Sequence, residues 1–212
     1  MSEQLVQVVL DRLQFPRGSA ADFSSNEPPA DGRASPDSRA GPYRAAVLVS
    51  GAIGEGKTSA VSFLAEQLVR RGISVDGVLA LRILDREAGR TIGYDLIAIR
   101  SGYRIPLARE HSPGQKAGRF FLREDALREA ERILRNAAVT QSVVILDEVG
   151  RLEMTGGGHA PALEAVLAGS ALPVLTIRRS LVGQMRDRLG ASAVDCVDVV
   201  RGELLNGREG GS

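Results

Sequence analysis

Short continuous apolar runs and longer runs with helical spacing alternate along most of this chain. The apolar runs have the length of strands and carry few polar residues, which is typical of strands buried on both faces of a parallel sheet. We predict five such strands, at residues 45–49, 78–81, 143–146, 174–177 and 194–200.

In the intervening segments, apolar residues recur three or four positions apart, which is the spacing of one helical face. They predict helices at residues 1–14, 57–71, 124–138, 160–168 and 181–189, and Gly72 closes the second of these. Strands that alternate with helices and are joined by right-handed crossovers predict an α/β fold. We expect a mostly parallel sheet with helices on both faces.

One section departs from this alternation. Residues 82–84 and 90–99 predict a β-hairpin around a turn at residues 85–89, inserted into the α/β pattern. Residues 101–118, with Pro and several Gly, predict a loop.

The N-terminal part has a different composition from the rest. Residues 16–42 are rich in Ser, Ala, Pro, Asp, Gly and Arg without periodicity, which is typical of a flexible linker. We therefore divide the chain into a flexible N-terminal extension with a short helix (1–42), one domain (43–205) and a flexible tail (206–212).

Composition and charge narrow the class of protein. Of 212 residues, 43% are hydrophobic and only 4% aromatic, and the net charge is +1. These values predict an aliphatic core and give no indication of nucleic-acid binding, which needs basic patches or stacking aromatics. Cys196 is the single cysteine, no signal peptide is recognisable, and no apolar run approaches a membrane span. We expect a cytoplasmic protein without membrane contact.

The segment after the first predicted strand reads Gly-Ala-Ile-Gly-Glu-Gly-Lys-Thr, which matches the Walker A pattern. Glycines let the backbone turn its N–H groups toward phosphate oxygens, and the helix that follows adds partial positive charge. Lys57 can reach the terminal phosphates, and the Thr58 hydroxyl can bind Mg2+. The expected nucleotide-binding residues are Gly51, Ala52, Ile53, Gly54, Glu55, Gly56, Lys57, Thr58 and Ser59.

A second motif ends the most apolar strand, at Asp147 and Glu148. An apolar strand that ends in Asp is the Walker B pattern, and the carboxyl end of that strand should face the phosphate loop. Asp147 would hold Mg2+, and Glu148 would orient or deprotonate the attacking water. Because a kinase positions an acceptor hydroxyl instead, Glu148 favours hydrolysis over transfer to a small molecule.

The negative charge that develops during phosphoryl transfer needs a cation nearby. The candidates are Arg178 with its neighbour Arg179, Arg151 after the Walker B motif, and Lys116 or Arg119 in the predicted loop. An Asn/Thr-Lys-x-Asp motif, with which classical GTPases read guanine, is absent from the sequence. We therefore expect little base selectivity.

Four segments together resemble the THEP1-type nucleoside-triphosphatase family, which includes cancer-related members. They are residues 51–58, 75–78, 90–95 and 147–154. The resemblance implies a RecA-like, ASCE-type P-loop fold and slow hydrolysis of ATP, GTP, CTP and other nucleoside triphosphates to diphosphates. It also implies that Glu148 is the catalytic glutamate.

Several positions depart from the family pattern. Arg151 stands where the family has Lys, Ser59 where it often has Thr, and residues 156–158 are three glycines. Residues 1–42 have no counterpart and would be the segment through which a protein partner binds.

Two alternatives to a stand-alone hydrolase use the same scaffold. A small-molecule or nucleotide kinase would transfer the phosphate to an acceptor, and a nucleotide-gated interaction protein would use slow hydrolysis as a timer.

Overall fold

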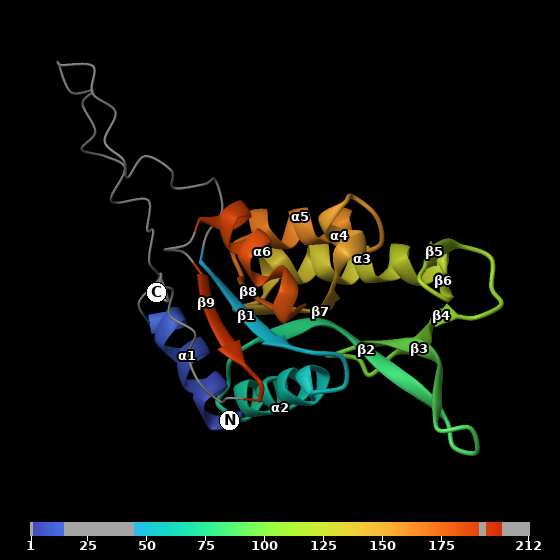
Figure 1. The fold of residues 1–212 in the computed structure, drawn as a ribbon. Coiled ribbons are helices and arrows are strands. Elements are labelled where there is room, and N and C mark those ends of the chain that lie inside the picture. The colour runs from blue at the N-terminus through green and yellow to red at the C-terminus, as the bar shows by residue number, and fades with distance from the viewer. Residues whose placement is uncertain (1, 15–44, 191–193, 201–212) are drawn as a thin grey trace, which may run out of the picture.

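The computed structural model describes residues 2–14, 45–190 and 194–200. The described residues form one mixed sheet of nine strands, in the order β5-β6-β4-β3-β2-β7-β8-β1-β9 (Figure 1). The predicted parallel core is confirmed, because the last five strands of this order pair in parallel. These strands are β2 (Val75–Asp85), β7 (Val143–Val149), β8 (Leu172–Arg178), β1 (Ala46–Gly51) and β9 (Val194–Asp198).

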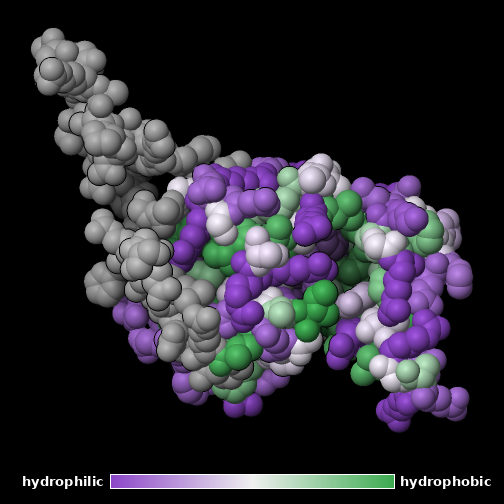
Figure 2. All heavy atoms as spheres, in the orientation of Figure 1, coloured by the Kyte–Doolittle hydropathy of each residue, from purple (hydrophilic) through white to green (hydrophobic). Residues whose placement is uncertain are grey.

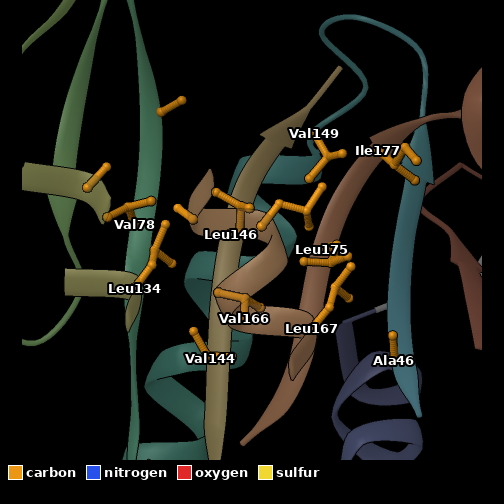
Figure 3. Close-up of a cluster of buried hydrophobic side chains, with 14 of the residues drawn as sticks. Ala46, Val78, Leu134, Val144, Leu146, Val149, Val166, Leu167, Leu175 and Ile177 are labelled. Atoms are coloured by element: carbon orange, nitrogen blue, oxygen red, sulfur yellow. The ribbon is translucent and has the colours of Figure 1, made fainter. Parts of the chain in front are cut away.

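Helices cover both faces of this parallel core (Figure 1). One face carries α1 (Ser2–Gln14) and α2 (Lys57–Arg70). The other carries α3 (Glu124–Thr140), α5 (Ala160–Ala168) and α6 (Val182–Leu189). In Figure 3, Val166 and Leu167 of α5 lie against Leu146 and Leu175 of the sheet. Both layers bury aliphatic side chains, as the low aromatic content predicts.

The antiparallel half of the sheet extends from β2. The predicted hairpin is formed by β2 and β3 (Arg90–Ala98), and it projects from the body of the protein (Figure 1). Three short strands follow: β4 (Arg104–Arg109), β5 (Gln115–Ala117) and β6 (Phe120–Leu122).

The prediction of a loop over residues 101–118 was wrong where β4 and β5 lie. The reason is that β4 and β5 are short strands held by antiparallel pairing with their neighbours β3 and β6, and strands of three to six residues leave little hydrophobic periodicity in the sequence. Asp95 of β3 accepts hydrogen bonds from Arg104 Nε at 2.6 Å and from Arg109 Nη2 at 2.5 Å.

The other helices and strands begin or end within a few residues of the predicted positions, except that β2 starts earlier and runs on into the hairpin. Three further short elements were not predicted: the strand β6, the helix α4 (Arg151–Met154) and the 3-10 helix η2 (Arg179–Leu181). The predicted linker at residues 16–42 and the predicted tail at residues 206–212 lie outside the described residues. No described helix is both long enough and apolar enough to cross a membrane.

The helix predicted near the N-terminus is present as α1, and it packs against α2. Leu5, Val6 and Val9 are almost completely buried in the cluster that also contains Val197 of β9. The buried guanidinium of Arg12 forms an ion pair with Asp195, also on β9. α1 is therefore part of the hydrophobic core on this face.

Truncating Leu5 to Ala should lower the free energy of unfolding by about 2–5 kcal/mol, because it leaves a cavity in this cluster. Urea denaturation measures the loss, and Gln7→Ala, at an exposed position of the same helix, should change it by less than about 0.5 kcal/mol. Equal stability of Leu5→Ala and the native protein would show that α1 adds nothing to the fold.

Candidate active site

The phosphate loop, residues 51–58, connects β1 to α2 as the Walker A pattern predicts. Gly54 and Gly56 have φ angles of 83° and 88°, which side-chain-bearing residues rarely adopt. Gly56 is the N-cap of α2 and has no side chain to bond the first N–H groups of the helix, so they can receive an anion. The buried Lys57 amine donates to the loop's own carbonyls, to Ala52 O at 2.7 Å and Gly51 O at 3.2 Å.

Not every predicted residue of the loop lines its interior. Ile53 is 70% exposed and Ser59 is exposed. The carboxylate of Glu55 accepts hydrogen bonds from Ala52 N at 2.5 Å and from Arg179 Nη2 at 3.0 Å. These contacts brace the loop from outside, so the structure places Glu55 in a supporting position.

Asp147 lies at the end of β7 and is 1% exposed. Its Oδ2 accepts hydrogen bonds from Thr58 Oγ1 at 2.8 Å and from Ala80 N at 3.1 Å. Its Oδ1 accepts one from Thr176 Oγ1 at 2.5 Å. Burial raises the pKa of the Asp147 carboxyl, while these hydrogen bonds and the charge of Lys57 oppose the rise. The structure thus brings the two predicted metal ligands, Thr58 and Asp147, into direct contact.

Glu148 occupies a break in the pairing of β7 with β8. Leu146 pairs with Leu175 and Val149 with Ile177, so Asp147 and Glu148 together face one residue, Thr176. Glu148 has a φ of 69°, the one positive φ outside glycine among the described residues. A backbone in this region costs about 1–3 kcal/mol and is common where function requires it.

The charges around Glu148 come from both motifs. Burial raises the pKa of Glu148 most, and Asp147 raises it further. The positive charges of Lys57 and Arg178 lower the same pKa. A carboxyl with a raised pKa is a better proton acceptor than an exposed one, which suits a general base.

The positively charged residues predicted to stabilise the transition state differ in their positions and partners. Arg178 is the last residue of β8 and its charge acts on Glu148, whereas its neighbour Arg179 donates from Nε to Asp198 Oδ2 at 2.7 Å and also binds Glu55. Arg151 is exposed at the start of α4. Arg119 lies over the Phe120 ring, 4.8 Å from its centroid. Lys116 is exposed on β5, in the antiparallel half of the sheet.

Sequence reasoning missed Thr176, which joins the two carboxylate residues. Its hydroxyl donates to Asp147 and accepts from Glu148 N at 2.7 Å. Thr176 is the polar residue inside the apolar run of β8, and that interruption was the available signal. A polar residue in the middle of a buried strand needs a partner, because an unpaired buried hydroxyl is costly.

Sequence reasoning also missed Glu153, a buried residue of α4. Its carboxylate accepts hydrogen bonds from Gly150 N at 2.8 Å and from His159 N at 3.1 Å. Glu153 thereby fixes the turn that follows the Asp-Glu pair, and it is one of the charges that raise the pKa of Glu148.

Replacing Thr176 with Val should lower the free energy of unfolding by about 1–3 kcal/mol, because it leaves Asp147 and Glu148 N–H without their shared partner. Phosphate release should fall about tenfold or more, because the two carboxylates lose their orientation. Thr176→Ser keeps the hydroxyl and should recover most of both losses. If the Val variant matched the native protein in both measurements, Thr176 would not position the carboxylates.

The chemistry of these residues fits Mg2+. This ion prefers oxygen ligands and is typically held by one or two carboxylates together with waters and substrate phosphates. Asp147 offers a buried carboxylate, and Thr58 offers a hydroxyl 2.8 Å away from it. Among the described residues there is no cluster of three or more His, Cys, Asp or Glu side chains of the kind that holds a metal without a substrate.

A glycine-rich loop joins β1 to the N-terminus of α2, and an Asp-Glu pair lies on β7, which is separated from β1 by β8. This arrangement defines a P-loop nucleotide-binding fold. The chain belongs to the THEP1-type nucleoside-triphosphatase family, because a family model described as NTPase matches residues 46–206. The nucleoside-triphosphatase THEP1 of Methanopyrus kandleri is 32% identical over 140 residues, which cover 61% of this chain and 77% of the relative. A cancer-related nucleoside-triphosphatase homolog of Bos taurus is 32% identical over 133 residues, which cover 58% and 68%. The resemblance found in the sequence is thereby confirmed.

Two solved structures have a similar fold. A human cancer-related nucleoside triphosphatase gives a TM-score of 0.54 at 24% identity, over 73% of this chain and 88% of that one. THEP1 from the hyperthermophile Aquifex aeolicus gives a TM-score of 0.52 at 21% identity, over 72% and 88%. Both support the α/β P-loop fold and nothing finer.

Proposed function

We propose that this protein hydrolyses nucleoside triphosphates to diphosphate and phosphate in the presence of Mg2+, with little base selectivity. The observation that carries the proposal is the contact of Thr58 with Asp147, with Glu148 next in the chain on a bulge. These side chains are the parts that a hydrolytic P-loop site needs. The names of the relatives support the same activity.

Binding would depend mainly on the phosphates. The N–H groups of the phosphate loop and of the first turn of α2 would donate to phosphate oxygens, and Lys57 would exchange its two loop carbonyls for the terminal phosphates. Thr58 and Asp147 would hold Mg2+, which when bound would neutralise negative charge on the phosphates. None of these contacts involves the base of the nucleotide, so we expect little selectivity among bases.

In the chemical step, Glu148 would hold a water in line with the terminal phosphorus. The water oxygen forms a bond to that phosphorus while the bond to the bridging oxygen breaks, and its electron pair stays on the diphosphate. The proton of the water goes to the Glu148 carboxylate. Arg178, whose charge acts on Glu148, would offset the negative charge of the phosphoryl group.

The test is phosphate release from ATP, GTP, CTP and UTP, each with and without Mg2+. We expect release from all four, with kcat/KM values within about tenfold of one another, since pockets that do not read the base discriminate weakly. Release should stop when the ion is chelated. Release confined to one nucleotide, or release that persists under chelation, would contradict the proposal.

A further inference from the structure

Arg82 on β2 reaches the phosphate loop from the projecting hairpin. A Cβ built on Gly54 would lie 3.9 Å from Arg82 Nη1, so the guanidinium borders the loop. The strand that carries Arg82 is fixed against the candidate site, because Ala80 N, two residues earlier, donates to Asp147 Oδ2. Arg82 is thus carried by a strand whose backbone contacts Asp147.

The surface is hollowed between the body of the protein and the projecting hairpin (Figure 2). Gly54 and Ile53 of the phosphate loop and Arg82 of the hairpin are all exposed to solvent. An exposed guanidinium at such a position can meet a ligand without a large desolvation cost.

Several other arginines near the hairpin are held by carboxylates. Arg90 binds Glu110 at 2.7 Å, Arg104 and Arg109 bind Asp95, and Arg123 binds Asp125 at 2.6 Å. The guanidinium of Arg82 has neither a hydrogen bond nor an ion pair with any described residue. An arginine that borders a phosphate loop and is not held by a carboxylate is free to bind an anion there.

Charged residues of the candidate site also act on Tyr94, the residue that pairs with Arg82 across the hairpin. Burial raises the pKa of Tyr94 most, and Glu148 raises it further. Arg82 and Arg178 both lower this pKa. Arg82, Arg178 and Glu148 are therefore all close enough to the Tyr94 side chain to act on its charge.

We propose that Arg82 is a catalytic residue that contacts the terminal phosphate and stabilises the charge that develops on it. It comes from the same chain, whereas such an arginine is often supplied by a partner protein. Arg82 and Arg178 would approach the phosphoryl group from two sides of the site. This inference rests on the proposed function. It adds a positive charge at the terminal phosphate from outside the phosphate loop and the Asp-Glu pair.

The experiment compares the native protein with Arg82→Ala and with Arg86→Ala, an exposed arginine in the turn of the same hairpin. Two quantities are measured for each: kcat for MgATP, and the ratio of the dissociation constants of ADP and a non-hydrolysable ATP analogue, both with Mg2+. We expect kcat of Arg82→Ala to fall about 10³-fold, the lower end for an arginine at this position. Its preference for the triphosphate analogue over ADP should fall about tenfold. Added guanidinium ion should restore part of the kcat, and Arg86→Ala should match the native protein.

If Arg82→Ala kept native kcat and the native ratio of dissociation constants, the proposal would be overturned. A loss of thermal stability in Arg82→Ala with both quantities unchanged would show that Arg82 only pairs with Tyr94 across the hairpin. If the native protein released no phosphate, the proposed function would fail by itself. The ratio of dissociation constants would then still decide whether Arg82 contacts the terminal phosphate.

Discussion

Replacing Glu148 with Gln is expected to lower kcat by about 10²–10⁴-fold, the range for loss of a general base. Gln has nearly the same shape and can take the same place on the bulge, but its amide cannot accept the proton of the attacking water. The hydrogen bond from Glu148 N to Thr176 involves the backbone and should persist. Affinity for a non-hydrolysable ATP analogue should therefore stay within about threefold of native.

Single-turnover phosphate release measures the chemical step, and calorimetric titration with the analogue measures affinity. Glu66→Gln, at an exposed position of α2, is the matched control for the loss of one carboxylate and should leave both values unchanged. Native kcat in Glu148→Gln would remove Glu148 from the mechanism. A fall in affinity as large as the fall in kcat would show that Glu148 supports binding instead.

Replacing Lys57 with Ala should weaken the binding of MgATP by about 100-fold or more, the effect of removing one partner of a buried charge pair. The Lys57 amine is 7% exposed and donates to two carbonyls of its own loop. The bound phosphates would replace those carbonyls as its partners, so the variant loses both a charge and its hydrogen bonds.

Calorimetric titration with MgATP measures this loss, and Arg70→Ala in the last turn of the same helix is the control for net charge. The control should bind as the native protein does. Native affinity in Lys57→Ala would mean that the nucleotide does not occupy the phosphate loop, whatever activity the protein has.

Much of the fold could be predicted because its core is made of continuous apolar runs. Residues 143–146 are completely buried in β7, and a parallel strand covered on both faces can be little else than apolar. The Walker A segment could be found as well, since its glycines and Lys57 bind phosphate together and lie within eight consecutive residues. These signals lie within short stretches of sequence.

The parts that could not be predicted depend on contacts between distant segments. The contact of Thr58 with Asp147 joins residues 89 positions apart in the sequence. The bulge at Glu148 depends on Thr176, 28 residues away. Arg82 was predicted to lie in a hairpin, but only the three-dimensional path of β2 brings it to Gly54. Position in space, and not residue type, distinguishes Arg82 from the many other arginines.

The central claim is that the terminal phosphoryl group passes to water at Glu148 and not to another acceptor. The most direct measurement is hydrolysis of MgATP in water enriched in heavy oxygen, followed by mass spectrometry of the phosphate and the ADP. We expect one solvent oxygen in each released phosphate, none in ADP, and a rate that falls in Glu148→Gln. Phosphate that is released only when an acceptor is added, or solvent oxygen in ADP, would contradict it.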